Sequence, residues 1–135
     1  MCLRVGKIKK RSTAKEDIVC YKAIKQYKLA KGYMTFYRDY PIELGNTYKS
    51  ELILLEYQIF NAIEIGLHSF ENYEDCKKFI SDNTKYVYNK EYFIVKCIIP
   101  KGSKYFKGIY MDFIDNGTIP YECYASDCLK YEEII

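Results

Sequence analysis

The sequence is poor in several residue types that common functional sites need. It contains no tryptophan, one histidine and three prolines in 135 residues. A single histidine excludes zinc sites built on several imidazoles, and Cys123 and Cys128 do not have zinc-ribbon spacing. We therefore predict no metal site and no resident cofactor.

Long apolar runs are also missing. No run in the sequence approaches the roughly 20 residues that a membrane-spanning helix needs. The first residues carry no apolar segment of the kind that marks a secretory signal. We therefore expect a cytoplasmic protein that has no membrane partner.

The excess of one charge sign is small. The net charge of +3 does not require a nucleic-acid partner, because dedicated binders carry a stronger and more clustered excess. The one visible basic cluster is near the N-terminus and consists of Arg4, Lys7, Lys9, Lys10, Arg11 and Lys15. Such charges commonly protect an edge strand from aggregation. The alternative is a nucleic-acid surface that adds Lys101, Lys104, Tyr105, Phe106 and Lys107.

The six cysteines favour a reducing compartment, because no secretory signal accompanies them. Cys20 and Cys97 lie in apolar, strand-like runs, where a thiol acts as a small buried hydrophobe. A cysteine nucleophile beside His68 is an alternative that no local pattern singles out. The sequence leaves open which thiols pair among Cys2, Cys20, Cys76, Cys97, Cys123 and Cys128.

Aromatic residues are abundant, with 16 tyrosines and 7 phenylalanines. Tyrosine and phenylalanine favour strands, so the composition indicates a large β component. Hydrophobic residues make up 49% and charged residues 29% of the chain, which is typical of a globular protein. We expect one domain over residues 1–135.

Local patterns predict the elements of this domain. Strands are expected at 2–8, 18–24, 33–38, 92–99, 105–113, 119–124 and 129–134, with a hairpin turn at 115–117. The spacing of Leu52, Leu55 and Ile59 fits a helix, although the run 53–55 also suits a strand. The predicted fold class is α+β: a mostly antiparallel sheet, a main helix at about 72–82, and a second helix or an irregular segment at about 51–63.

The stretch from Gly66 to Phe70 and the following helix form the centre of this prediction. Asn72 is a suitable N-cap, and an apolar helix face is formed by Tyr73, Cys76, Phe79 and Ile80. His68 and Ser69 lie at the strand–helix junction, where an anionic ligand can bind. The alternative is structural: His68 bonds to a nearby backbone group, and the Ser69 hydroxyl satisfies the helix end.

Three segments in order resemble a group of short proteins, without an agreed activity, of phages and their bacterial hosts. The segments are Gly66-Leu67-His68-Ser69-Phe70, Ile99-Pro100-Lys101-Gly102-Ser103-Lys104-Tyr105 and Tyr124-Ala125-Ser126-Asp127, preceded by Tyr21-Lys22-Ala23-Ile24. The resemblance covers about residues 18 to 132. It implies a phage-related accessory protein that binds a host or viral protein, in the host cytoplasm if a phage encodes it.

A more distant likeness is to ADP-ribosyltransferase-like folds. It implies an NAD site with His68, Ser69 and Glu122 as catalytic residues and Lys22 or Arg38 as ligand-binding residues. In such a site a cation or imidazole holds ribose or phosphate oxygens, and a carboxylate stabilises the cationic sugar as nicotinamide leaves. Lys22 departs from the expected arginine or histidine, and no glutamate lies two residues before Glu122.

Three hypotheses about function arise from these patterns. The first is an accessory protein that acts by binding a host or viral protein, since no complete catalytic constellation is visible. The alternative is an ADP-ribosyltransferase-like nucleotide-binding domain or enzyme, and the second alternative is a nucleic-acid binder. The sequence leaves enzymatic activity open.

Overall fold

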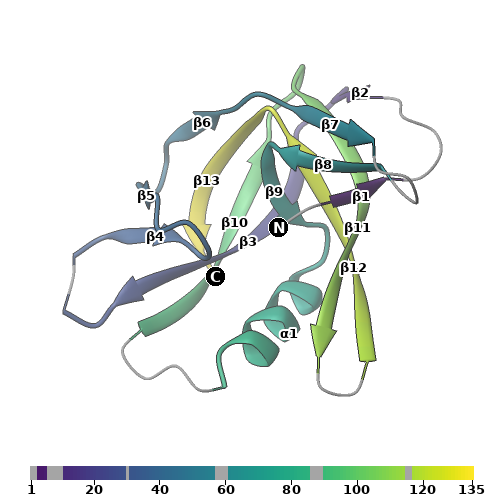
Figure 1. Cartoon of the computed structure of the whole chain (residues 1–135). Coiled ribbons are helices and arrows are strands. Elements are labelled where there is room, and N and C mark those ends of the chain that lie inside the picture. The colour runs from purple at the N-terminus through teal and green to yellow at the C-terminus, as the bar shows by residue number, and fades with distance from the viewer. Residues whose placement is uncertain (1–2, 6–10, 30, 57–60, 86–89, 115–116) are drawn as a thin grey trace.

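A computed structural model gives the structure of the chain and describes residues 3–5, 11–29, 31–56, 61–85, 90–114 and 117–135 (Figure 1). Within these ranges there are thirteen strands and one helix, α1. The elements are β1 (Leu3–Val5), β2 (Ser12–Thr13), β3 (Ile18–Tyr27), β4 (Tyr33–Thr35), β5 (Pro41–Ile42), β6 (Thr47–Lys49), β7 (Ile53–Glu56), β8 (Asn61–Ile65), β9 (Leu67–Phe70), α1 (Tyr73–Asn83), β10 (Lys90–Ile99), β11 (Lys104–Ile114), β12 (Gly117–Ser126) and β13 (Cys128–Ile134).

The strands form one sheet in which every described pairing is antiparallel. Its order is β6-β13-β10-β3-β9-β12-β11-β1-β8-β7, with β2 on β11, and β4 and β5 extending from β3. The strands at the two ends of this order, β6 and β7, are separated in the chain only by residues 50–52. The 47–56 segment therefore brings the two ends of the sheet together (Figure 1).

Two long antiparallel pairs supply most of the regular sheet. Strand β3 runs beside β10 from the pair Ile18–Ile99 to the pair Tyr27–Lys90, and β11 forms a hairpin with β12. The β-branched and aromatic residues of these segments favour a pleated, half-buried surface. The predicted strands 18–24 and 92–99 are confirmed, and so is the hairpin, although residues 115 and 116 of its turn lie outside the described ranges.

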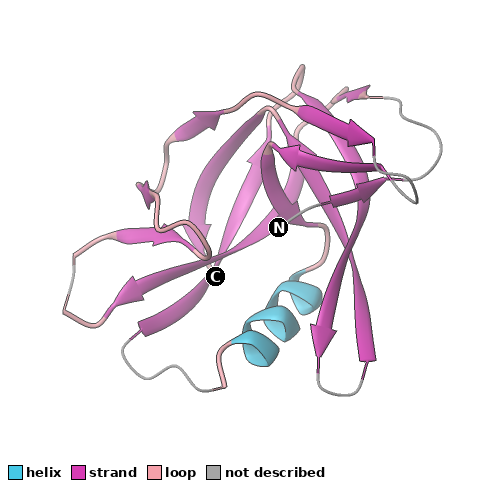
Figure 2. Ribbon diagram, in the orientation of Figure 1, coloured by secondary structure: helices cyan, strands magenta, loops and turns pink. Residues whose placement is uncertain are grey.

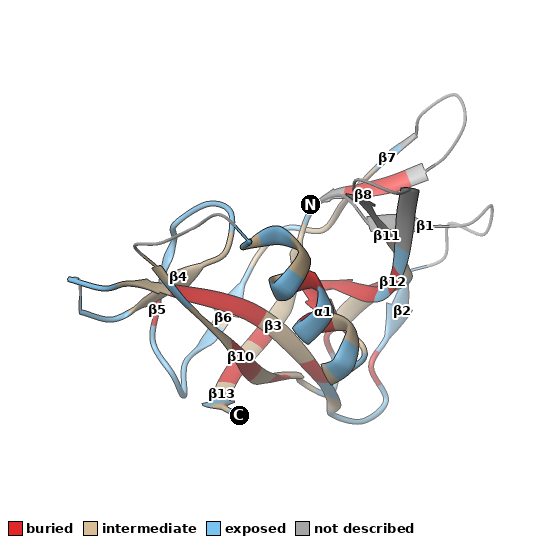
Figure 3. Cartoon of the chain, turned by 90° about the horizontal axis from the view of Figure 1, so that it is seen from below, coloured by how far each residue is buried: buried red, intermediate tan, exposed pale blue. Residues whose placement is uncertain are grey.

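Helix α1 confirms the predicted helix to within one residue. Asn72 is the N-cap, but its side chain makes no capping hydrogen bond; its Nδ2 atom donates to Asp75 Oδ2 at 3.4 Å instead. Cys76 and Phe79 are buried, and Tyr73 and Ile80 pack against the same cluster. Figure 3 shows exposed residues along the outer side of α1 and buried segments in the strands beside it.

Buried residues form two clusters. Under α1, the rings of Phe36, Phe70 and Tyr121 lie 5.0, 5.1 and 6.1 Å from the ring of Phe79. The second cluster contains Cys20, Ile24, Val95, Cys97, Ile99, Tyr124, Leu129 and Tyr131. Packing in the core thus accounts for a large part of the buried aromatic side chains.

The predicted α+β class is wrong, because the described chain is nearly all β (Figure 2). The second helix at about 51–63 is also wrong, since residues 53–56 and 61–65 are strands; residues 57–60 lie outside the described ranges. Strand β8 pairs with β7 on one side and with β1 on the other. These ladders satisfy the backbone of the segment, and tertiary pairing overrides the helical spacing of its leucines.

Replacing Phe79 with alanine should lower the free energy of unfolding by about 3–5 kcal/mol, because it empties the centre of the aromatic cluster. Urea unfolding followed by circular dichroism measures this change. Lys78→Ala is the matched control, since Lys78 is exposed on the same helix and its replacement should have little effect. A loss below about 1 kcal/mol for F79A would show that Phe79 is not a core residue.

Candidate ligand-binding cavity

Strands β3 and β9 pair at one point and then separate. Their register consists of the single pair Tyr21–Phe70, whereas β9 pairs with β12 along its whole length. The Lys22 side chain crosses the resulting gap, and its Nζ atom donates a hydrogen bond to the backbone oxygen of His68 at 2.7 Å. A side chain thus makes a cross-strand bond at a place where the backbone ladder has ended.

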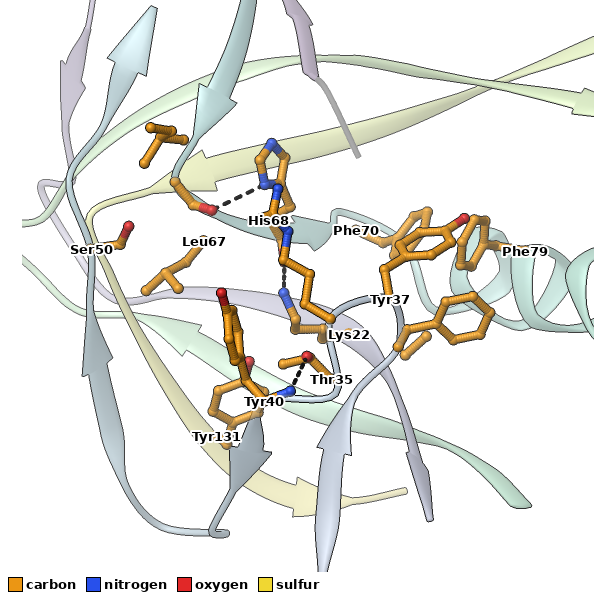
Figure 4. A pocket seen from close by; sticks show the side chains of 15 residues that line it. Lys22, Thr35, Tyr37, Tyr40, Ser50, Leu67, His68, Phe70, Phe79 and Tyr131 are labelled. Carbon is orange, nitrogen blue, oxygen red and sulfur yellow. Dashed lines mark hydrogen bonds between the residues drawn. The ribbon is translucent and has the colours of Figure 1, made fainter. Parts of the chain in front are cut away.

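A cavity of about 310 Å³ opens beside this bond (Figure 4). Its volume is at the lower end of the range of about 300–1,000 Å³ typical of small-molecule sites. The cavity is lined by β3, by the segment 35–40, by the corner 65–68, and by single residues of other elements. The lining residues are Lys22, Ala23, Thr35, Phe36, Tyr37, Arg38, Tyr40, Ser50, Ile65, Gly66, Leu67, His68, Phe70, Phe79 and Tyr131.

The cavity carries positive charge. Lys22 and Arg38 line it, and none of the described lining residues is an aspartate or a glutamate. Burial lowers the pKa of Lys22, because a charged amino group loses hydration that no carboxylate replaces. Arg38 is exposed to solvent. The site therefore has an inner amino group and an outer guanidinium.

His68 is buried, with 8% of its surface exposed. Its ring packs against the backbone of the corner between β8 and β9. Its Nδ1 atom lies 3.1 Å from the backbone oxygen of Gly66, and its Nε2 atom lies 3.3 Å from that of Ile63. Burial and the nearby Lys22 charge lower the pKa of His68 to about 4, so the ring is neutral near pH 7. In Figure 4 the ring points away from the Lys22 amino group, and the backbone oxygen of His68 is the atom that Lys22 contacts.

Ser69 does not line the cavity with His68. Neighbouring residues of a strand point to opposite faces of the sheet, and Ser69 is fully buried on the side of Cys20. Burial raises the pKa of the Cys20 thiol to about 11, and the nearby Ser69 hydroxyl opposes this rise. Ser69 therefore lies near Cys20 of the second buried cluster and is not among the residues that line the cavity.

Glu122 also lies outside the cavity lining, on the exposed surface of β12. The neighbouring Glu71 carboxyl raises the pKa of Glu122, whereas Glu122 and Lys107 lower the pKa of Glu71. Lys107 Nζ lies 2.9 Å from Glu71 Oε1. The structure thus brings Lys22, Arg38 and His68 together among the predicted site residues, and it places Ser69 and Glu122 elsewhere.

The segment 35–40 forms a wall of the cavity that local patterns in the sequence do not single out as part of a site. It is closed by hydrogen bonds from Thr35 N to Tyr40 O at 2.9 Å and from Tyr40 N to Thr35 Oγ1 at 3.0 Å. Asp39 has a φ of 56°, a left-handed conformation that aspartate tolerates better than most residues. The sequence signal here is the polar run before Pro41, which marks a turn but not a cavity wall.

Asp39 fixes the segment 35–40 to the sheet. Its carboxylate forms an ion pair with Lys25, whose side chain is 6% exposed, and it accepts a hydrogen bond from Tyr27 Oη at 3.3 Å. The hydrogen bond from Lys25 is the main cause that lowers the pKa of Asp39. Lys25 lies on β3, the strand that also carries Lys22. Its ion pair with Asp39 therefore holds the cavity wall formed by segment 35–40 against that strand.

The basic residues proposed for nucleic-acid binding come partly together, because β2 pairs with β11 through Lys104–Thr13 and Tyr105–Ser12. Lys107 is paired with Glu71, and Lys104 Nζ donates to Thr13 Oγ1. Residues 7, 9 and 10 lie outside the described ranges, and the side chain of Arg4 is not described. Exposed positions are left at Arg11, Lys15 and Lys101.

Among the described residues, no group of three or more histidine, cysteine or acidic side chains could hold a metal ion. The described cysteines, at positions 20, 76, 97, 123 and 128, are free thiols; Cys2 lies outside the described ranges. The described part of the chain also contains no helix with the length and apolar character needed to cross a bilayer.

Comparison with known proteins gives no family. No family model, no curated protein and no solved structure matches the chain. The resemblance to phage-related proteins and the distant likeness to ADP-ribosyltransferase-like folds therefore stay predictions, as do an NAD ligand, a protein partner and a nucleic-acid partner. A proposal about function therefore depends on the charge, size and lining residues of the cavity.

The pKa of His68 makes folding depend on pH. In the folded chain the pKa is about 4, below the ordinary value of 6.5, so the unfolded chain binds a proton first as the pH falls. The neutral, buried His68 ring therefore adds to the free energy of unfolding fully above about pH 6.5. As the pH falls from 6.5 toward 4, the free energy of unfolding decreases by up to about 1.4 kcal/mol per pH unit.

Because His68 is the only histidine, one imidazole signal in a nuclear magnetic resonance titration reports it directly. We expect that ring to stay neutral at pH 5, and we expect urea unfolding of His68→Gln to depend less on pH between 6.5 and 5 than that of the natural chain. A ring that titrates near its ordinary pKa would contradict the buried geometry.

Replacing Asp39 with asparagine should lower the urea midpoint at pH 7, because the buried Lys25 loses its counter-ion. The Asp39 carboxylate contributes to the free energy of unfolding at pH values above its ordinary pKa. This contribution is lost as the pH falls through the lowered pKa of Asp39 in the folded chain. The double variant Lys25→Met with Asp39→Asn should regain part of the lost stability. If the single and double variants unfold at the same urea concentration, the ion pair does not anchor the segment 35–40.

Proposed function

We propose that this protein binds a small organic anion with an apolar ring, and that the cavity beside Lys22 is the binding site. One observation carries the proposal: the Lys22 amino group faces an aromatic cavity whose described lining contains a second cation, Arg38, and no carboxylate. A ligand anion would supply the missing counter-charge.

The charge of the cavity favours an anion. A buried charge without a partner costs free energy, and an ion of opposite sign regains it. Lys22 makes its described hydrogen bond to a neutral backbone oxygen, that of His68, so a negative group would be a better partner. Arg38 offers a planar, bidentate donor that matches a carboxylate or phosphate.

The walls of the cavity favour an apolar ring on the same ligand. The rings of Phe36 and Tyr37 line the cavity and lie 4.8 Å apart, and the buried ring of Phe79 lies 5.0 Å behind Phe36, so one side of the cavity is an aromatic surface (Figure 4). Aromatic rings stack or meet edge to face at such surfaces. With about 310 Å³ of space, the fitting class is a single-ring aromatic carboxylate or phosphate.

The test compares benzoate and phenyl phosphate with neutral benzamide, by ligand-observed nuclear magnetic resonance and by thermal shift. We expect saturable binding of the anions and binding of benzamide weaker by about tenfold or more, since a hydrogen bond to a charged group contributes about 1.5–3 kcal/mol. Equal binding of benzamide and benzoate would remove the proposed role of the cations.

Lys22→Met should reduce benzoate binding by at least about tenfold, because it removes the amino group and keeps the aliphatic stem. Lys101→Met is the matched control, since Lys101 is exposed in a turn away from the cavity lining, and it should bind as the natural chain does. Circular dichroism establishes that both variants fold. A folded Lys22→Met variant with unchanged affinity would overturn the assignment of the site.

A further inference from the structure

The Lys22 amino group differs from other lysine amino groups that the structure describes. Lys25 is paired with Asp39, Lys107 with Glu71, and Lys130 with Glu132 at 3.7 Å. Lys22 has no carboxylate partner among the described residues, and its hydrogen bond goes to a carbonyl oxygen. Burial lowers the pKa of Lys22, and Lys22 lines the cavity.

We propose that Lys22 is a nucleophile that forms an imine with an aldehyde or keto group of an aromatic acid bound in this cavity. This inference rests on the proposed function, and it adds the reactive group of the ligand. The ring of the ligand would lie on the surface formed by Phe36 and Tyr37, and its acid group would meet Arg38.

The geometry suits an attack by the amine. A neutral amine has two N–H bonds and one lone pair. One N–H is used by the His68 oxygen at 2.7 Å, which orients the side chain and leaves the lone pair and the second N–H for the cavity. Burial lowers the pKa of Lys22 and so raises the fraction of neutral amine near pH 7, as in other lysines that form imines in apolar pockets.

The reaction needs no further reactant. The Lys22 nitrogen forms a bond to the carbonyl carbon, the π electrons of the carbonyl move to its oxygen, and a proton passes from nitrogen to that oxygen to give a carbinolamine. The carbinolamine then loses one water as the C=N bond forms. No atom is oxidised or reduced, and water reverses the reaction.

The test uses 4-formylbenzoate, which combines a ring, a carboxylate and an aldehyde, with cyanoborohydride added to reduce any imine to a stable amine. Peptide mapping by mass spectrometry compares the rate of labelling at Lys22 with the rate at Lys101. We expect Lys22 to be labelled at least about tenfold faster, because burial lowers its pKa and the bound ligand holds the aldehyde beside its amine. Labelling should saturate with 4-formylbenzoate and should slow when benzoate competes.

Two outcomes separate this inference from the proposed function. If benzoate binds saturably but Lys22 is labelled no faster than Lys101, the imine proposal fails and the binding proposal stands. If neither benzoate nor 4-formylbenzoate binds saturably, both proposals fail. Lys22→Arg removes the primary amine and should lose the fast labelling, and a fast-labelled site that persists in this variant would overturn the assignment to Lys22.

Discussion

Strands β3 and β9 exchange backbone contacts at the pair Tyr21–Phe70 and then diverge. The bond from Lys22 Nζ to the His68 oxygen, at 2.7 Å, spans the gap between them. A backbone carbonyl that would lack a strand partner thereby receives a donor, which buried polar groups require. The gap also leaves the space that becomes the cavity, so one interaction both completes the sheet and places a cation beside an apolar pocket.

The corner before β9 depends on close packing. A Cβ atom at Gly66 would lie 2.8 Å from Leu52 Cδ1, so a larger residue would require that side chain to move. Both ring nitrogens of His68 lie near backbone oxygens of this corner, and the neutral ring donates a hydrogen bond to one of them. His68 therefore supports the chain where it passes from β8 to β9, and the carbonyl that accepts from Lys22 is held in place as a consequence.

Lys22 and Lys25 show how tertiary structure gives similar residues different chemistry. Both lie on β3, three positions apart, and nothing local distinguishes them. Lys25 meets Asp39, because a left-handed residue in the segment 35–40 turns back toward the strand. Lys22 meets a neutral carbonyl and the cavity. Lys25 has a carboxylate partner within the protein, whereas the proposed partner of Lys22 is the anionic group of a ligand.

Local sequence patterns are sufficient to predict the elements whose signals are local: helix α1 from Asn72 onward, the apolar strand ending at Ile99, and the hairpin that joins β11 to β12. They also single out His68, whereas Lys22 is expected at a site only from the likeness to ADP-ribosyltransferase-like folds. The pairing of residues 53–56 with 61–65 as strands, and the separation of Ser69 and Glu122 from the cavity, depend on the tertiary structure. The reason is physical: strand pairing and cavity walls join residues distant in sequence, and local periodicity carries no information about which partner a strand will find.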